Sequence, residues 1–182
     1  MTRLALVASI ALAAVSTVSL AQSRSPYAGF ETRAIKSLSD QQISDLRAGL
    51  GMSLALAAEL NGYPGPRHTL DFANELNLSD AQRAKVDALF AAMKAESIAI
   101  GDKLIAQEKE LDQQFAHKTI TSASLVTSTQ AIGGTQAALR AAHMKYHLLT
   151  VEILTPAQVQ RYIELRGYTG LLEHDPARRH PD

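Results

Sequence analysis

The chain has no cysteine and no tryptophan among its 182 residues. Without cysteine it forms no disulfide, has no thiol nucleophile and offers no thiolate ligand, so packing, association or a bound ligand must stabilise it. Aromatic residues make up only 5% of the chain, which argues against stacking surfaces for sugars or bases. Basic and acidic residues balance at 18 each, so the composition gives no electrostatic basis for binding nucleic acid.

Common catalytic motifs are also missing. No serine stands in a Gly-x-Ser-x-Gly elbow, and the Gly133-Gly134 pair is not followed by the Lys-Ser/Thr of a phosphate-binding loop. His143 and His147 have the spacing of zinc proteases, but Met144 stands where those enzymes need a glutamate. We therefore expect no enzymatic activity and no organic cofactor.

The one long apolar run is at the N-terminus. Residues 4–18 are almost wholly apolar, and Ser19-Leu20-Ala21 then places small residues before Gln22. This pattern is typical of a signal peptide, so we expect cleavage after residue 21 and export to the periplasm. The alternative is an uncleaved membrane anchor, because residues 4–21 are just long enough to span a bilayer.

A helix-start pattern occurs three times. Each copy reads Leu, then Ser or Thr, two further residues and Gln: Leu38-Ser39-Asp40-Gln41-Gln42, Leu78-Ser79-Asp80-Ala81-Gln82 and Leu154-Thr155-Pro156-Ala157-Gln158. In such a capping box the hydroxyl accepts the backbone N–H of the Gln, and the Gln side chain accepts the backbone N–H of the capping residue. The pattern predicts helices that begin at residues 40, 80 and 156.

Apolar periodicity predicts an all-α fold built on a long antiparallel helical hairpin. We expect its helices over residues 80–117 and 122–153, each with an apolar seam at alternating three- and four-residue spacing. At Gly133-Gly134 the second helix either kinks or lets a neighbour's backbone approach. Short flanking helices are expected over residues 40–48, 52–60, 67–76 and 156–166.

The apolar pattern also divides the chain into segments and predicts a homodimer. After the signal peptide, residues 22–36 are expected to form a flexible leader, residues 37–168 the helical domain and residues 169–182 a disordered tail. The stretch at residues 52–60 is nearly all apolar and must be buried in the fold or against a partner. Since the hairpin seam covers one side only, we expect pairing with a second copy.

A histidine pair is the strongest candidate for chemistry. His143 and His147 are four residues apart, so their imidazoles project from one helix face and suit two ligands to one Zn²⁺, Cu²⁺ or Ni²⁺. Folding the hairpin about residues 119–120 places Glu96 opposite His143 as a third ligand, and His68 is the candidate fourth. Glu59 is a weaker option. The alternative is that both histidines are hydrogen-bonded core residues without a metal.

The repeated Leu-Ser/Thr-x-x-Gln motif in a small exported helical chain resembles the Spy/CpxP group of periplasmic envelope-stress proteins, over roughly residues 27–168. Residues 51–68, which include Asn61-Gly62-Tyr63-Pro64-Gly65-Pro66, resemble its heavy-metal-sensor subgroup. The resemblance implies a metal-responsive binding protein, with a membrane-bound signalling partner as one possibility. It also implies an alternative, an ATP-independent chaperone that holds unfolded clients on an amphipathic surface of a dimer. The balanced charge weakens that alternative, because such surfaces usually combine basic with apolar residues.

Overall fold

The structure, a computed structural model, describes residues 25–168 and residue 170. The predicted signal peptide and nearly all of the predicted tail lie outside the described residues. Within them the chain is helical, and its only β-type pairing is an isolated bridge between Ile35 and Leu38. The elements are η1 (Phe30–Thr32), α1 (Asp40–Ala48), α2 (Leu56–Glu59), α3 (Pro66–Asp71), α4 (Asp80–Ala116), α5 (Ser122–Ile153) and α6 (Pro156–Leu165). The all-α prediction is confirmed.

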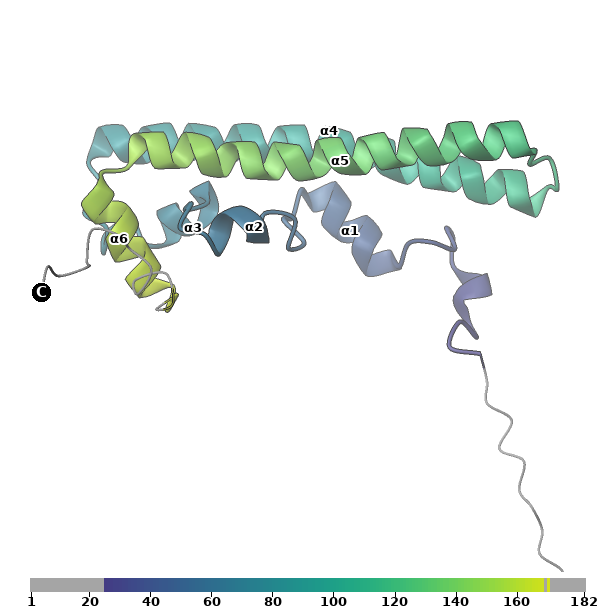
Figure 1. The fold of residues 1–182 in the computed structure, drawn as a ribbon, viewed down its shortest axis with the longest axis horizontal. Helices are drawn as coiled ribbons and strands as arrows, with labels where there is room; N and C mark the ends of the chain where they lie inside the picture. The colour runs from purple at the N-terminus through teal and green to yellow at the C-terminus, as the bar shows by residue number, and fades with distance from the viewer. Residues whose placement is uncertain (1–24, 169, 171–182) are drawn as a thin grey trace, which may run out of the picture.

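Helices α4 and α5 form the predicted long antiparallel hairpin, and the shorter helices lie along one side of it (Figure 1). Helices α1 and α3 contact α4, while α2 and α3 contact α5. Helix α6 lies at the end of the hairpin opposite its turn (Figure 1). Among the described helices, none is long and apolar enough to cross a membrane.

All three predicted capping boxes are formed. The hydroxyls of Ser39, Ser79 and Thr155 each accept the backbone N–H of the third helical residue, a Gln in every case, and the Gln side chain accepts the N–H of the cap. Helices α1, α4 and α6 therefore begin where the sequence predicted. A fourth box that the sequence reading did not anticipate, Thr121 with Ser124, starts α5.

The second and third boxes also bind each other. Gln82 Nε2 donates to Gln158 Oε1 at 2.8 Å, and Gln158 Nε2 donates to Gln82 Oε1 at 3.1 Å. The leucines that precede these caps, Leu78 and Leu154, are buried in one hydrophobic cluster with Tyr162. The repeated motif thus does more than start two helices, because it fastens the beginning of α4 to the beginning of α6.

A second, larger cluster joins α1 to the hairpin, and the predicted seams run into it. Its buried members are Ile35, Leu38, Leu46, Leu104, Ile105, Ile132 and Leu139. The seam prediction is confirmed along most of the hairpin, but Phe115 and Leu125 near its turn are exposed. Ile35 belongs to the predicted flexible leader, so the core of the described chain begins before residue 37.

Close backbone packing holds α1 on α4. A Cβ atom on Gly101 would lie 2.7 Å from the backbone oxygen of Leu46, so only glycine allows this approach. By contrast, apart from the adjoining backbone of α5 itself, no atom of the described chain lies within 4 Å of a Cβ built on Gly133 or Gly134, and α5 continues through both. Within the described chain, no neighbouring backbone approaches this glycine pair.

The two middle helices are shorter than predicted. Residues 52–60 are helical only over Leu56–Glu59, because Met52 and Ser53 have left-handed φ angles of 40° and 64° that interrupt a helix. Helix α3 ends at Asp71 rather than at residue 76. The apolar stretch is also not fully buried within the chain, since Leu56 and Leu60 are each 47% exposed.

Candidate functional site

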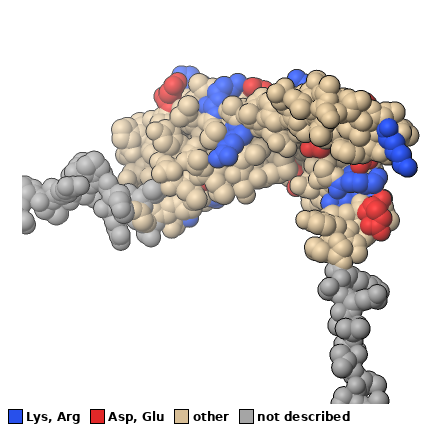
Figure 2. Space-filling view, turned by 45° about the vertical axis from the view of Figure 1, so that its right-hand side comes forward, with Lys and Arg blue, Asp and Glu red and all other residues tan. Residues whose placement is uncertain are grey.

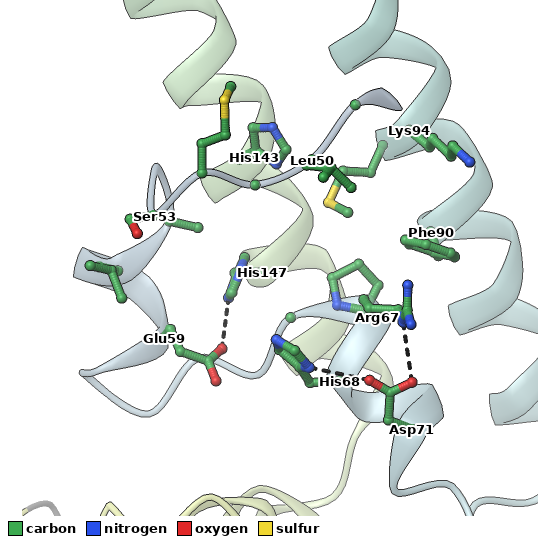
Figure 3. A pocket seen from close by; sticks show the side chains of 18 of the residues that line it. Leu50, Ser53, Glu59, Arg67, His68, Asp71, Phe90, Lys94, His143 and His147 are labelled. Atoms are coloured by element: carbon green, nitrogen blue, oxygen red, sulfur yellow. Dashed lines mark hydrogen bonds and ion pairs between the residues drawn. The ribbon is translucent and has the colours of Figure 1, made fainter. Parts of the chain in front are cut away.

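An open pocket of about 570 Å³ lies where the short helices meet the hairpin (Figure 3). The loop after α1 forms one wall, α2 and α3 form another, and α4 and α5 close the far side. Its chemically distinctive lining residues are Met52, Glu59, Arg67, His68, Asp71, Met93, Lys94, His143, His147 and Arg166. The pocket therefore brings together three of the histidines and both charge signs.

His143 and His147 line this pocket from successive turns of α5 (Figure 3). His143 is only 2% exposed, and its Nε2 is buried without a hydrogen-bond partner in the described chain. Burial, together with repulsion from the nearby His147, lowers the pKa of His143 below its ordinary value of 6.5. His143 is therefore neutral near pH 7, which is the form of imidazole that binds metals.

His147 is held in a defined orientation by its other ring nitrogen. Nδ1 lies 2.6 Å from the backbone oxygen of Tyr63, and a carbonyl only accepts, so Nδ1 carries the hydrogen. Nε2 makes no hydrogen bond within the described residues. The ring packs on Gly65, where a Cβ would lie 2.7 Å from Cε1 and 2.8 Å from Nε2. Metal-binding histidines commonly donate their second N–H to a carbonyl or carboxylate in this way.

Glu59 stands behind His147 as a buried carboxylate. Its Oε1 accepts hydrogen bonds from Tyr162 Oη at 2.7 Å, Arg166 Nε at 3.0 Å and Tyr168 Oη at 3.1 Å. Its Oε2 lies 3.7 Å from His147 Nδ1 and has no hydrogen bond of its own (Figure 3). Burial and the Glu59 charge raise the pKa of Tyr162, so this phenol stays protonated and donates. Glu59 thus links α2, α5 and the end of α6.

Of the other predicted ligands, Glu96 does not line the pocket. Its carboxylate binds Lys145 Nζ at 2.7 Å and Tyr146 Oη at 2.8 Å. These two hydrogen bonds hold the pKa of Glu96 below its ordinary value. The predicted register placed Glu96 opposite His143, whereas the hairpin places it opposite the residues two and three positions further along.

His68, by contrast, lines the same pocket as the histidine pair. It lies at the rim, with its side chain 44% exposed and its Nδ1 3.2 Å from Asp71 Oδ2. The other Asp71 oxygen pairs with Arg67 Nε at 3.2 Å (Figure 3). His68 therefore shares the pocket with His143 and His147 but is bound to a neighbour on its own helix.

The pocket as it stands offers two imidazoles rather than a complete coordination shell. Within the described residues, no three side chains of the His, Cys, Asp or Glu types lie close enough to hold one ion. The residues fit a metal in part, because His143 and His147 each retain an unbonded Nε2 on the same pocket. Further ligands must come from His68, from a donor outside this residue set, or from solvent.

Sequence reasoning missed the roles of Glu59 and of the two methionines in the lining. A lone acidic residue in the apolar 52–60 stretch is the signal for a buried carboxylate, whereas the sequence indicates Glu59 only as a weaker metal ligand. Met52 and Met93 carried no such signal, since methionine in an apolar stretch or on an apolar seam is ordinary core.

Comparison with protein-family models places the chain in a described family. The family model described as "LTXXQ motif family protein" matches residues 67–166, more than half of the chain. The matched range contains both mutually bonded boxes, at Gln82 and Gln158, together with the histidine pair. No curated protein and no solved structure matches.

Proposed function

Because the chain belongs to the LTXXQ motif family, whose members are typically periplasmic and generally not enzymes, we propose that it is a Spy/CpxP-like envelope protein that binds a transition-metal ion at His143 and His147. Zn²⁺, Cu²⁺ and Ni²⁺ are the divalent candidates, because imidazole suits all three. The protein would sense the metal by binding it, and no bond of the protein would be made or broken apart from those to the metal.

One observation carries this proposal. The Nε2 of His143 is buried without a partner, one helical turn from a second imidazole whose Nε2 is also unbonded. A buried polar atom without a partner costs about 1–3 kcal/mol, so a structural role alone leaves that cost unexplained. A bound cation removes it. The Tyr63 carbonyl and Glu59 on the far side of His147 keep its free nitrogen available.

Metal binding would act on the arrangement of helices. The two imidazoles belong to α5, while Glu59 belongs to α2 and is bonded to the end of α6 through Arg166. An ion on His147 draws electron density through the ring and strengthens the Nδ1–H donor that faces Tyr63 and Glu59. Occupancy would therefore stiffen the contacts of α2 and α6 with the hairpin.

Thermal unfolding tests the proposal, because a ligand that binds only the folded state raises the melting temperature. We expect Zn²⁺, Cu²⁺ or Ni²⁺ in excess to raise it, and a chelator to reverse the effect. The double variant His143→Ala/His147→Ala should lose the increase, whereas His117→Ala, at the exposed end of α4, should keep it. A melting temperature indifferent to all three ions would remove the basis of the proposal.

A second candidate function, chaperone activity, is favoured by a separate observation. Leu50, Leu56, Leu60 and Tyr63 form an exposed apolar set on α2 and its flanking loops, between 41% and 49% exposed. Such a surface suits an unfolded client or a second copy of the chain. On the face drawn in Figure 2, however, basic and acidic side chains are scattered among uncharged ones rather than gathered into a basic cradle.

An aggregation assay tests this second candidate. The chain at equimolar ratio should suppress aggregation of an unfolded client, and Leu56→Ser/Leu60→Ser should weaken the suppression. Leu148→Ser, at an exposed leucine of α5, is the matched control. Equal client aggregation with and without the unaltered chain would remove this candidate. Sedimentation of the same variants separates client binding from pairing of two copies.

A further inference from the structure

Most oxygen donors around the histidine pair are already occupied, and the unbonded carboxylate oxygen, Glu59 Oε2, lies 3.7 Å from His147 Nδ1, the nitrogen that carries the hydrogen. Asp71 is paired with Arg67 and His68, and Glu59 Oε1 already accepts three hydrogen bonds. The chain contains no cysteine. Besides the His68 imidazole at the rim, Met52 and Met93 line the pocket, and each carries a thioether sulfur with an available lone pair. Two imidazoles and two thioethers thus surround one space.

Each methionine reaches the pocket from a different element. Met93 is a buried seam residue of α4, so helix packing against α5 fixes its position. Met52 lies in the loop after α1 and has a φ of 40°, a left-handed conformation that is unfavourable for a non-glycine residue. It also packs against the α1 core cluster. The loop therefore keeps an unfavourable backbone geometry at a residue that lines the pocket.

The charge of the lining favours a singly charged over a doubly charged ion. Arg67, Lys94 and Arg166 outnumber the two carboxylates, and both carboxylates are paired with arginine. Imidazole and thioether ligands carry no charge when they bind a metal. Transferring an ion from water into such surroundings has a cost that rises with the square of its charge, so a monovalent ion is penalised far less. Soft thioether ligands select Cu(I), whereas Zn²⁺ in proteins takes imidazole, thiolate and carboxylate ligands.

We propose that the preferred ion of this pocket is Cu(I), held by Nε2 of His143 and His147 and by the sulfur atoms of Met52 and Met93. The proposal rests on the proposed function, because it requires the histidine pair to bind metal. It adds the identity of the ion and two methionine ligands beside the two histidines.

Competition with a chromophoric Cu(I) chelator, without oxygen and with a reductant, measures the affinity. We expect Met52→Leu and Met93→Leu each to weaken Cu(I) binding by at least about tenfold while zinc affinity stays within about twofold. Met144→Leu is the matched control, since this α5 residue stands beside His143 but does not line the pocket, and it should bind as the unaltered chain does. Leucine conserves the volume of methionine, so the variants should remain folded.

Results that overturn the Cu(I) assignment can be distinguished from a failure of metal binding itself. Unchanged Cu(I) affinity in both methionine variants makes them core residues and leaves the histidine pair as a metal site. Tighter binding of zinc than of Cu(I) by the unaltered chain also contradicts Cu(I) as the preferred ion and leaves the histidine pair as a metal site. If the unaltered chain binds none of these metals, the proposed function is contradicted as well. If a methionine variant unfolds, X-ray absorption of the Cu(I)-loaded unaltered chain decides, because nitrogen scatterers without sulfur contradict the assignment.

Discussion

Removing the Glu59 carboxylate should destabilise the chain more than any exposed substitution. Glu59 is only 6% exposed and connects α2 to the end of α6 through hydrogen bonds from Tyr162, Arg166 and Tyr168. In Glu59→Ala the fully buried Tyr162 hydroxyl loses its acceptor, and Arg166 loses its counter-charge. Both groups are then left in surroundings that water reaches poorly.

The magnitude follows from these two losses. Breaking a buried ion pair by removing one partner costs about 3–5 kcal/mol, and a stranded buried hydroxyl costs about 1–3 kcal/mol. The two costs overlap, and the Arg166 side chain is 26% exposed, so water compensates part of its loss. We therefore expect a loss of about 3 kcal/mol in the free energy of unfolding. Glu59→Gln should lose less, because an amide oxygen still accepts from Tyr162.

Urea unfolding of metal-free protein, followed by circular dichroism, measures this loss. A destabilisation of about 3 kcal/mol lowers the midpoint by about 1–2 M urea. The control is Glu164→Ala, which removes an exposed pair with Arg161 at 3.0 Å and should cost at most about 1 kcal/mol. If the two variants unfold at the same urea concentration, the Glu59 network does not hold α6, and the reasoning is refuted.

Three further predictions concern the pocket and the hairpin. Gly65→Ala should weaken zinc binding by at least about tenfold in calorimetry, because its Cβ would displace the His147 ring; unchanged affinity would show that the ring position is unimportant. In metal-free protein, the free energy of unfolding should be highest above pH 6.5, where His143 is neutral in the unfolded chain as well. It should decrease as the pH falls from 6.5 toward the lowered pKa of His143 in the folded state. Urea midpoints measured against pH should show this decrease, and His143→Gln should make it smaller. Gly133→Ala should stabilise α5 by about 1 kcal/mol in thermal unfolding, since its Cβ enters open space; destabilisation would indicate a contact with another molecule.

The helix starts could be predicted because a capping box is a local device. Ser39 and Gln42 are three residues apart, so their reciprocal bonds depend on little besides the intervening backbone. What the boxes do together was not predictable. Gln82 and Gln158 come into contact only after the hairpin has folded, and neither copy of the motif indicates that the other is its partner.

The hairpin itself was predictable, but its register was not. Apolar spacing specifies which face of each helix is buried, and Val86 and Leu139 are buried as expected. The offset of one helix along the other depends on the turn, where Lys118 adopts a left-handed φ of 57°. A symmetric fold about residues 119–120 misses that offset, which is why Glu96 was assigned to His143 rather than to Tyr146.

The Glu59 network lay beyond sequence reasoning for a different reason. Its carboxylate partners Tyr162, Arg166 and Tyr168 are more than one hundred residues away in the chain. An isolated glutamate in an apolar stretch indicates a buried charge that needs partners, but only the fold identifies them. The histidine spacing was local, so the shared face of His143 and His147 was predictable.

The central claim is that His143 and His147 bind one metal ion through their unbonded Nε2 atoms. Titration calorimetry with zinc, on the chain and on His143→Ala/His147→Ala side by side, tests it most directly. We expect saturable binding of one ion per chain, micromolar or tighter, that the double variant loses. Equal heats from the two proteins, or none from the unaltered chain, would contradict the account and leave both histidines as structural residues of α5.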